Sequence, residues 1–370
     1  MSHYNHLSEI IFIFLEFSYL ILCLIYIFSP IKLLLIFIYP LAAIKFSLSS
    51  TASFDIKNYE KIYDIANGFS FDPVMEQEGA FVSLLYFFKS INFPLFIVHG
   101  LEIIGFLLAV KFLFESFLPT EKAIAISFLF GLFSATGEMG TYLLRQLLST
   151  SLVFVALGFL FRDKKIWSWV FFGFSFLFHS SSFAYIPLFV STLFHGKYTK
   201  AFVIVGGYAV LIMLAINTNL GTSAITSLTG EHSVYVTKHN YYTQLANQSG
   251  WRDQTIGTFS KVMIAYFVGI NIWKKGLFWK SQYWMYYLFT IVITFFYLLL
   301  EESRLFWLSS RFNFISDIFI LSSCLLITIE IIPERDHKLF ITLVSLLLFS
   351  VSVLIILVGY DSNVLFKVPF

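Results

Sequence analysis

Charged residues are scarce in this chain of 370 residues, and the scarcity excludes several classes of protein. Asp, Glu, Lys and Arg together make up 12% of the sequence, whereas soluble domains carry roughly 25%. The net charge is only +2, and no basic patch is long enough to follow a phosphate backbone. The composition therefore argues against a soluble enzyme and against a nucleic-acid partner.

Cysteine and the common cofactor motifs are also nearly absent. The two cysteines, Cys23 and Cys324, both lie in apolar stretches, so no disulfide is expected. No HExxH or CxxC spacing occurs, and no glycine-rich phosphate loop follows a strand-like segment. The sequence predicts no metal and no cofactor.

Apolar residues are abundant instead. They make up 58% of the chain, Phe alone occupies 47 positions, and the mean hydropathy is +0.81. Apolar runs near 20 residues recur from end to end, and each is long enough to cross a hydrocarbon core about 30 Å thick. The pattern predicts an all-α polytopic membrane protein, with residues 1–370 forming a single integral membrane domain.

About twelve membrane-spanning helices are predicted when both halves of one split pair are counted. The first helix is expected to be retained in the protein and not cleaved as a signal peptide. The predicted spans are 7–28, 31–50, 95–114, 122–137, 142–161, 166–178 with 181–194, 200–217, 258–274, 281–300, 311–332 and 339–359. Basic short loops such as RDKK at 162–165 and PERDHK at 333–338 alternate correctly along the chain. By the positive-inside rule these loops are cytoplasmic, and both termini lie outside.

Two long segments fall on the outer side in this scheme. Segment 51–94 is expected to form interfacial helices, because treating EGAFVSLLYFFKSINF as a crossing breaks the alternation downstream. Segment 218–257 is rich in Asn, Thr, Gly, Tyr and His and is predicted to be a substrate loop. Its aromatic residues, such as Tyr241, suit a sugar-binding lid, although an interfacial aromatic belt fits them equally well. His232 is a further candidate for substrate contact, and the alternative for it is a solvated loop side chain.

A histidine interrupts the apolar run between residues 166 and 194. His179 and the serines after it, beginning with Ser180, stand near its centre in FLFHSSSFAY. Polar groups at such a depth usually face a protein interior or a wet cavity. We expect a helical hairpin with His179 near its tip, towards the outer face. His179 would act as a base, as a hydrogen-bond donor to a phosphate or sugar oxygen, or as a packing residue.

Arginines on the predicted outer side are candidates for phosphate binding. Arg145, Arg304 and Arg311 lie near outer helix ends, against the usual bias. A guanidinium group binds phosphate bidentately and stays charged at any working pH. The alternative is that they extend to lipid headgroups or pair with nearby acids.

Carboxylates of the first outer loop are candidates for a general base. Asp55 and Glu78 are the two favoured here, because a hydroxyl that attacks a sugar carbon must lose its proton. The alternative for each is a solvated loop charge.

Five short motifs follow one another along the chain: Asp55-Ile-Lys-Asn-Tyr59, Glu78-Gly79-Ala80-Phe81, Arg145-Gln146, Phe178-His179-Ser180-Ser181 and the late Arg311. In order and spacing they resemble the EpsG family of exopolysaccharide proteins, which includes Wzy-type O-antigen and capsule polymerases. The resemblance covers roughly residues 45–360. Two departures stand out: the family usually has Glu-Pro-Gly-Phe where this chain has EGAF, and an Arg and a Gly before the Asp, where this chain has SLSSTASFD.

The resemblance implies a polysaccharide polymerase at the outer face of the bacterial inner membrane. Separately, the first outer loop, with an acidic residue and interfacial helices, is similar to the layout of GT-C glycosyltransferases. The donor and acceptor of the polymerase would be oligosaccharides linked to undecaprenyl diphosphate, and a chain-length regulator would be a further partner. The arginines would hold the diphosphate, and Tyr59 and Gln146 would join the substrate contacts. Two rival classes are a flippase for lipid-linked oligosaccharides and an acyltransferase of surface sugars.

Overall fold

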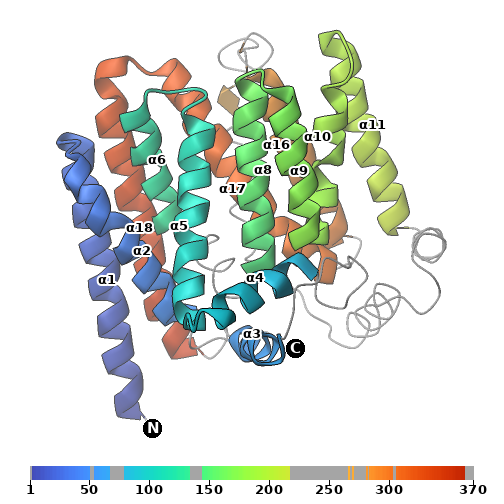
Figure 1. The fold of residues 1–370 in the computed structure, drawn as a ribbon. Coiled ribbons are helices and arrows are strands. Elements are labelled where there is room, and N and C mark those ends of the chain that lie inside the picture. Colours follow the sequence, from blue (N-terminus) through green and yellow to red (C-terminus); the bar gives the residue numbers. More distant parts are fainter. Residues whose placement is uncertain are drawn as a thin grey trace. The chain divides into compact units, whose positions relative to one another are not determined.

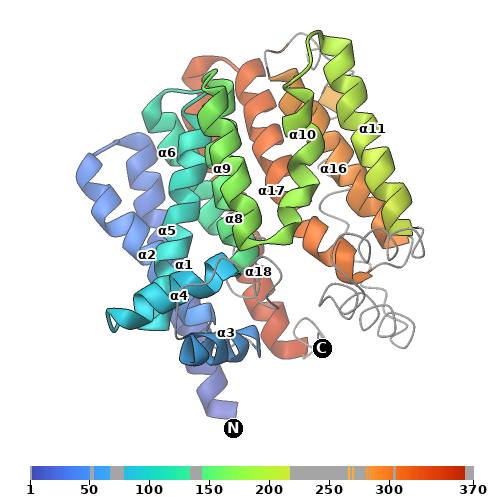
Figure 2. The same ribbon diagram turned by 45° about the vertical axis from the view of Figure 1, so that its right-hand side comes forward.

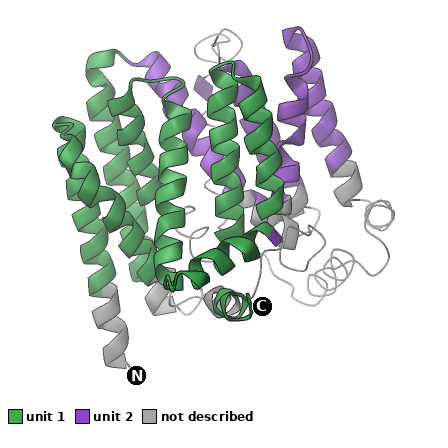
Figure 3. Cartoon of the chain, in the orientation of Figure 1, with its two compact units in different colours: residues 1–71, 80–179, 333–370 green, residues 72–79, 180–332 purple. Residues whose placement is uncertain are grey.

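The structure, a computed structural model, is all-helical in the part of the chain that it describes, as the sequence predicts (Figure 1). The described residues are 2–50, 54–66, 79–133, 144–216, 266, 269–270, 281, 283–302 and 306–362. The chain divides into two compact units, which are coloured in Figure 3. Unit 1 comprises residues 1–71, 80–179 and 333–370, and unit 2 comprises residues 72–79 and 180–332.

Four helices of the described part are long and apolar enough to cross a membrane. They include Leu95–Phe114, which matches the predicted span 95–114, and Leu144–Phe161. The other two are Ile10–Phe28 and Glu334–Leu354. These helices support a membrane protein, whereas the count of twelve crossings, the GT-C-like layout and the single domain remain predictions.

Unit 1 is a layered helical bundle in which α5 is central (Figures 1 and 2). Helix α5 packs against α2, α6 and α8; α9 covers α8, and α1 and α18 pack together beside α6. These helices are α1 (Ser2–Phe28), α2 (Leu35–Ser50), α5 (Leu95–Phe114), α6 (Thr120–Leu132), α8 (Leu144–Phe161), α9 (Lys165–Phe178) and α18 (His337–Ser362). Short 3-10 turns, η1 (Lys32–Leu34) and η3 (Glu334–Asp336), precede α2 and α18.

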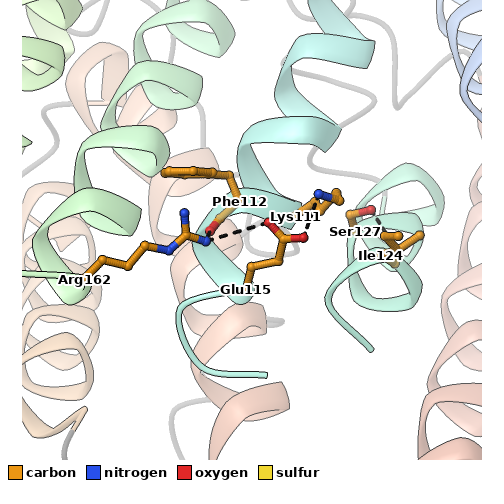
Figure 4. A network of polar contacts seen from close by, with 6 residues as sticks. All are labelled: Lys111, Phe112, Glu115, Ile124, Ser127 and Arg162. Carbon is orange, nitrogen blue, oxygen red and sulfur yellow. Dashed lines mark hydrogen bonds and ion pairs between the residues drawn. The ribbon is translucent and has the colours of Figure 1, made fainter. Parts of the chain in front are cut away.

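The basic turns of unit 1 gather at one end of the bundle. Arg162, at the end of α8, donates to the carbonyl of Phe112 at 2.9 Å and pairs with Glu115 at 3.7 Å (Figure 4). Lys122, at the start of α6, pairs with Glu334 before α18 at 2.7 Å. The loops that the sequence assigns to one side of the membrane therefore do meet at one end of unit 1, which we call the basic end.

Two short helices lie at the opposite end. In Figure 1, α4 (Gly79–Ser90) runs across the ends of α5 and α8 instead of alongside them, and α3 (Phe54–Ile65) lies beneath it. Tyr63 donates to the carbonyl of Phe93 at 2.6 Å, and Lys89 to that of Ala66 at 3.1 Å, which fixes α3 against α4. Each helix has 12 residues and rises only about 18 Å, too little to cross a bilayer. Both positions agree with the predicted interfacial helices.

The break at the histidine is confirmed. Helix α9 ends at Phe178, and His179 has extended backbone (φ −161°, ψ 135°). The predicted helix 181–194 is wrong in detail, because a 3-10 helix, η2 (Ser180–Tyr185), is followed by the short α10 (Ile186–Ser191). Pro187 lies in the first turn of α10 and has no N–H to continue a preceding helix, which explains why a new helix starts there.

Unit 2 is built around helices joined by hydroxyl groups. Helix α16 (Trp284–Glu302) packs on α17 (Phe306–Ile331), and α11 (Lys197–Ile216) packs on α10 and α16. Hydrogen bonds join Thr290 to Ser323 at 2.7 Å and Ser316 to Thr294 at 2.9 Å. In hydrocarbon, where water cannot compete, such pairs hold neighbouring helices together.

Two predicted boundaries need correction. Residues 306–310 were expected to be a loop before the span, but α17 begins at Phe306, so Arg311 lies more than a turn inside the helix. Helix α6 ends at Leu132, short of the predicted residue 137, because Phe133 turns to extended backbone (φ −80°, ψ 125°). The amino group of Lys45 binds the carbonyl of Gly131 at 2.5 Å and so satisfies this helix end.

Close packing of α5 and α8 depends on Gly158. A Cβ there would lie 2.6 Å from the ring of Phe112. We expect Gly158→Ala to lower the free energy of unfolding by about 1–3 kcal/mol, the usual effect of overpacking. Thermal unfolding in detergent would measure it, with Gly173→Ala in α9 as the control, because a Cβ at Gly173 meets nothing within 4 Å. Equal losses in the two variants would contradict this explanation.

Candidate functional site

Arg145 and Gln146 lie in the first turn of α8, at the end of unit 1 opposite the basic end. Gln146 is fully buried, and Arg145 is half-buried. The first turn of a helix directs unpaired N–H groups outward and carries a partial positive charge. Together with the guanidinium, this helix end is suited to an anion such as a phosphate.

His179 is at the same end, because α9 runs antiparallel to α8. The ring centroid of Phe159, near the end of α8, lies 6.4 Å from that of Trp167 and 5.3 Å from that of Phe171. Because Trp167 and Phe171 belong to the first half of α9, the start of α9 lies beside the end of α8. The end of α9 therefore lies beside the first turns of α8. His179 is 5% exposed, and its backbone N–H donates to the carbonyl of Ser175 at 3.2 Å.

An apolar cluster ties these helix ends to the two short helices, and we call it the mouth cluster. It joins Leu144, adjacent to Arg145, and Phe178, adjacent to His179. Five helices thus contribute to one patch of unit 1 around Arg145 and His179. Its members are Tyr59, Ile62, Phe81, Leu85, Val98 and Leu144, with Phe178 among the side chains packed against it.

Tyr59, a predicted substrate contact, is a structural member of this cluster. Its ring packs edge-on against Phe81 at 5.5 Å and against the imidazole of His99 at 6.3 Å. Tyr59 is 5% exposed. It therefore covers His99 on the side where α3 lies.

His99 and Glu102 of α5 are both buried, and neither belongs to the motifs that the sequence predicts to be functional. An ionisable side chain inside a membrane-spanning segment is unusual and commonly functional. That signal was available in LFIVHGLEIIG, the start of the α5 sequence. We add both residues to the candidate site.

A polar layer continues from α5 to α8. The ring centroids of Phe106 and Phe154 are 5.9 Å apart, and those of Phe112 and Phe159 are 5.0 Å apart. Later residues of α5 thus lie beside later residues of α8, so the two helices run in the same direction. Glu102 lies four residues before Phe106 in α5, and Thr150 lies four residues before Phe154 in α8. Four residues correspond to about 6 Å along a helix. Glu102 and Thr150 are therefore at the same level of unit 1, deeper than Arg145.

Three other predicted residues lie in described helices. Asp55 lies in α3, Ser180 in η2 and Arg311 in α17, but their side chains are not among those described. Arg311 belongs to unit 2, so its relation to Arg145 stays a prediction. The following lie outside the described residues: Glu78, Arg304, His232 and Tyr241.

No cluster of metal-ligating side chains is present in the described part of the chain. The two free cysteines, Cys23 and Cys324, are both buried and lie in different units. The chemistry of this end of unit 1 rests on a guanidinium, two imidazoles, a carboxyl group, an amide and hydroxyl groups.

Comparison with known proteins assigns the family. No curated protein and no solved structure matches the chain. The model of the EpsG family matches residues 31–367, nearly the whole chain. This membrane protein therefore belongs to the EpsG family, a family of Wzy-like polymerases.

Proposed function

We propose that the protein polymerises a polysaccharide from lipid-linked repeat units at the outer face of the bacterial inner membrane. It would transfer a growing glycan from undecaprenyl diphosphate to the end of a new lipid-linked repeat unit. Family membership over residues 31–367 carries the proposal. The leaving diphosphate carries its own charge, so guanidinium groups can stabilise its departure without acid catalysis.

Arg145 is the principal diphosphate ligand in this proposal. It begins α8 beside the mouth cluster, at the end opposite the basic turns, which by the positive-inside rule is the outer end. Arg311 and Arg304 would complete the cationic site. Fixed guanidinium groups stabilise the charge that develops on the departing diphosphate.

The acceptor hydroxyl requires a base as it attacks the anomeric carbon. The sequence offers Glu78, His179 and Asp55 for this role. His179 has the clearest structural support, because it is buried in unit 1 at the level of the first turns of α8. Substrate contacts would come from Tyr59, Gln146, Ser180, His232 and Tyr241.

Deletion of the gene tests the proposal against its rivals. We expect single repeat units on the surface glycan instead of a ladder of lengths when that glycan is resolved on a gel. Complementation with the wild-type gene should restore the ladder. Loss of all repeat units would indicate a flippase, and a full ladder of altered mass would indicate an acyltransferase; either pattern would refute a polymerase.

A further inference from the structure

One face of helix α8 is apolar and half-buried along its length, and Arg145 stands at its head. The residues of this face recur every three or four positions, which places them in one row on a helix. The row stays partly accessible although α8 lies between α5 and α9 and packs against both (Figure 1). This row, which we call the α8 strip, consists of Leu148, Leu152, Val155 and Phe159.

Helix α5 borders the strip on one side with an exposed apolar face. The ring centroid of Phe112 lies 5.0 Å from that of Phe159. Three further residues continue the row of Phe112 at helical spacing, namely Leu101, Gly105 and Leu108. Both leucines are exposed, so this face of α5 stays accessible beside the strip.

Helix α9 borders the strip on the other side. Near the basic end, Trp167 and Phe171 contact the ring of Phe159. Phe178, on the same face of α9, packs against the mouth cluster at the opposite end. Phe174 lies between them and is 51% exposed. This face of α9 therefore follows the strip from one end to the other.

Gly105 leaves room beside the middle of the strip. It shares a face of α5 with Phe112, and a Cβ at Gly105 would meet no atom within 4 Å. Gly173 of α9 also has open space, but it follows Phe171 by two residues and so lies about 200° around the helix from it. A larger side chain at Gly105 would therefore fill space beside the strip, whereas one at Gly173 would face away from it.

The two ends of the strip differ in chemistry. At the mouth, Arg145 stands in line with the strip, about one turn before Leu148, where the first turn of α8 favours an anion. At the basic end, aromatic rings from α5 and α9 meet that of Phe159 and close the strip. The cation of that end, Arg162, already pairs with Glu115. The order suits an amphiphile with an anionic head at Arg145 and an apolar tail along α8.

We propose that the α8 strip binds the polyprenyl tail of the donor, an assignment that rests on the proposed polymerase function. The diphosphate would lie at Arg145, and the tail would run along Leu152 and Val155 towards Phe159. About 21 Å of helix separates Arg145 from Phe159, which is most of a hydrocarbon core about 30 Å thick. A strip one side chain wide between two helices suits a single prenyl chain better than the two chains of a phospholipid.

Close packing, not polarity, would hold the tail. Lipid chains are as apolar as the strip, so the hydrophobic effect does not favour one over the other. The tail binds through its fit between α5 and α9 and through its anchored head. A tail held in this way fixes the depth and orientation of the diphosphate, and hence of the anomeric carbon that reacts. Filling the space beside the strip should therefore weaken binding.

Photocrosslinking of the full-length protein in lipid nanodiscs is the first test, and it needs no polymerisation. Phe174 is replaced by the photoreactive p-benzoylphenylalanine, and the probe is radiolabelled undecaprenyl diphosphate. We expect label on the protein that excess unlabelled undecaprenyl diphosphate removes and phosphatidylglycerol does not. Phe14, an exposed phenylalanine of α1, is the matched control position and should take up little label. Adding Arg145→Ala should lower the labelling at Phe174, because the head anchors the tail.

Added bulk beside the strip is the second test. We expect Gly105→Leu to lower both the labelling at Phe174 and the amount of glycan polymer roughly 10-fold or more, a usual effect of overfilling a packed site. Gly173→Leu makes the same change on the face turned away and should preserve both. A Cβ at either glycine has open space, so both variants should fold, which thermal unfolding in detergent checks.

The outcomes separate this inference from the proposed function. A ladder that survives deletion of the gene refutes the polymerase, whereas the labelling pattern judges the strip. Equal labelling at Phe174 and Phe14, or equal competition by phosphatidylglycerol, would show that the strip holds ordinary lipid and would refute the inference. Labelling unchanged in Gly105→Leu would refute it too. Equal losses in Gly105→Leu and Gly173→Leu would show a general effect of bulk and would also overturn it.

Discussion

The Arg145→Ala variant is expected to abolish the glycan ladder and leave single repeat units, with normal amounts of protein in the membrane. Removing one preorganised charge from a developing anion usually lowers a rate roughly 100-fold or more. Because the side chain is only half-buried at the start of α8, the fold should tolerate alanine. A gel of the surface glycan, with protein level measured by immunoblot, checks the result.

A second substitution at the same position separates charge from geometry. Arg145→Lys keeps the charge but loses the planar fork that binds phosphate bidentately, so we expect it to restore little of the ladder. Arg335→Ala is the matched control, because Arg335 is an exposed arginine in the turn before α18, at the basic end. A normal ladder from Arg145→Ala would exclude Arg145 from the diphosphate site.

Breaking the buried ion pair of unit 1 is expected to have the largest effect on stability. Lys45 and Glu16 lie 2.8 Å apart with side chains 5% and 8% exposed, and Ser352 of α18 donates to Glu16 at 3.1 Å. Lys45→Met should lower the free energy of unfolding by about 3–5 kcal/mol, because it leaves a carboxylate buried without its cation. Thermal unfolding in detergent measures the loss.

The double variant tests whether charge is the cause. Replacing both partners, as in Glu16→Leu with Lys45→Met, removes the unpaired charge and should recover much of the stability. Lys111→Met is the control, because its pair with Glu115 spans one helical turn and is partly exposed, and such pairs contribute only about 0.3–0.5 kcal/mol. A double variant no more stable than Lys45→Met would show that packing, not charge, explains the loss.

Local patterns in the sequence were enough to predict several parts of this protein. The span 95–114 coincides with α5, and the break at His179 and the helix start near Arg145 were both found. Long apolar runs, a polar interruption and the distribution of basic turns are properties of neighbouring residues. In lipid, backbone groups must bond within the segment, so such segments become helices whatever their tertiary neighbours are.

Helix boundaries were less predictable where tertiary contacts or a proline decide them. At the end of α6, the carbonyl of Gly131 accepts a hydrogen bond from Lys45, which is far away in sequence. A new helix, α10, starts beside Pro187 because proline fits the first turn of a helix. The sequence alone did not show that a 3-10 helix precedes it. Arg311 is predicted to stand at the head of its span, but α17 already begins at Phe306.

The sequence by itself determined that this is a membrane protein of helices, with basic turns on one side and Arg145 and His179 at predicted outer helix ends. Only the tertiary structure paired Glu16 with Lys45, set Tyr59 against His99, and left Glu102 and Thr150 covered at one level of unit 1. The physical reason is that the side of a helix facing another helix depends on their register and rotation. Those are fixed by packing between segments far apart in the chain, which no local pattern encodes.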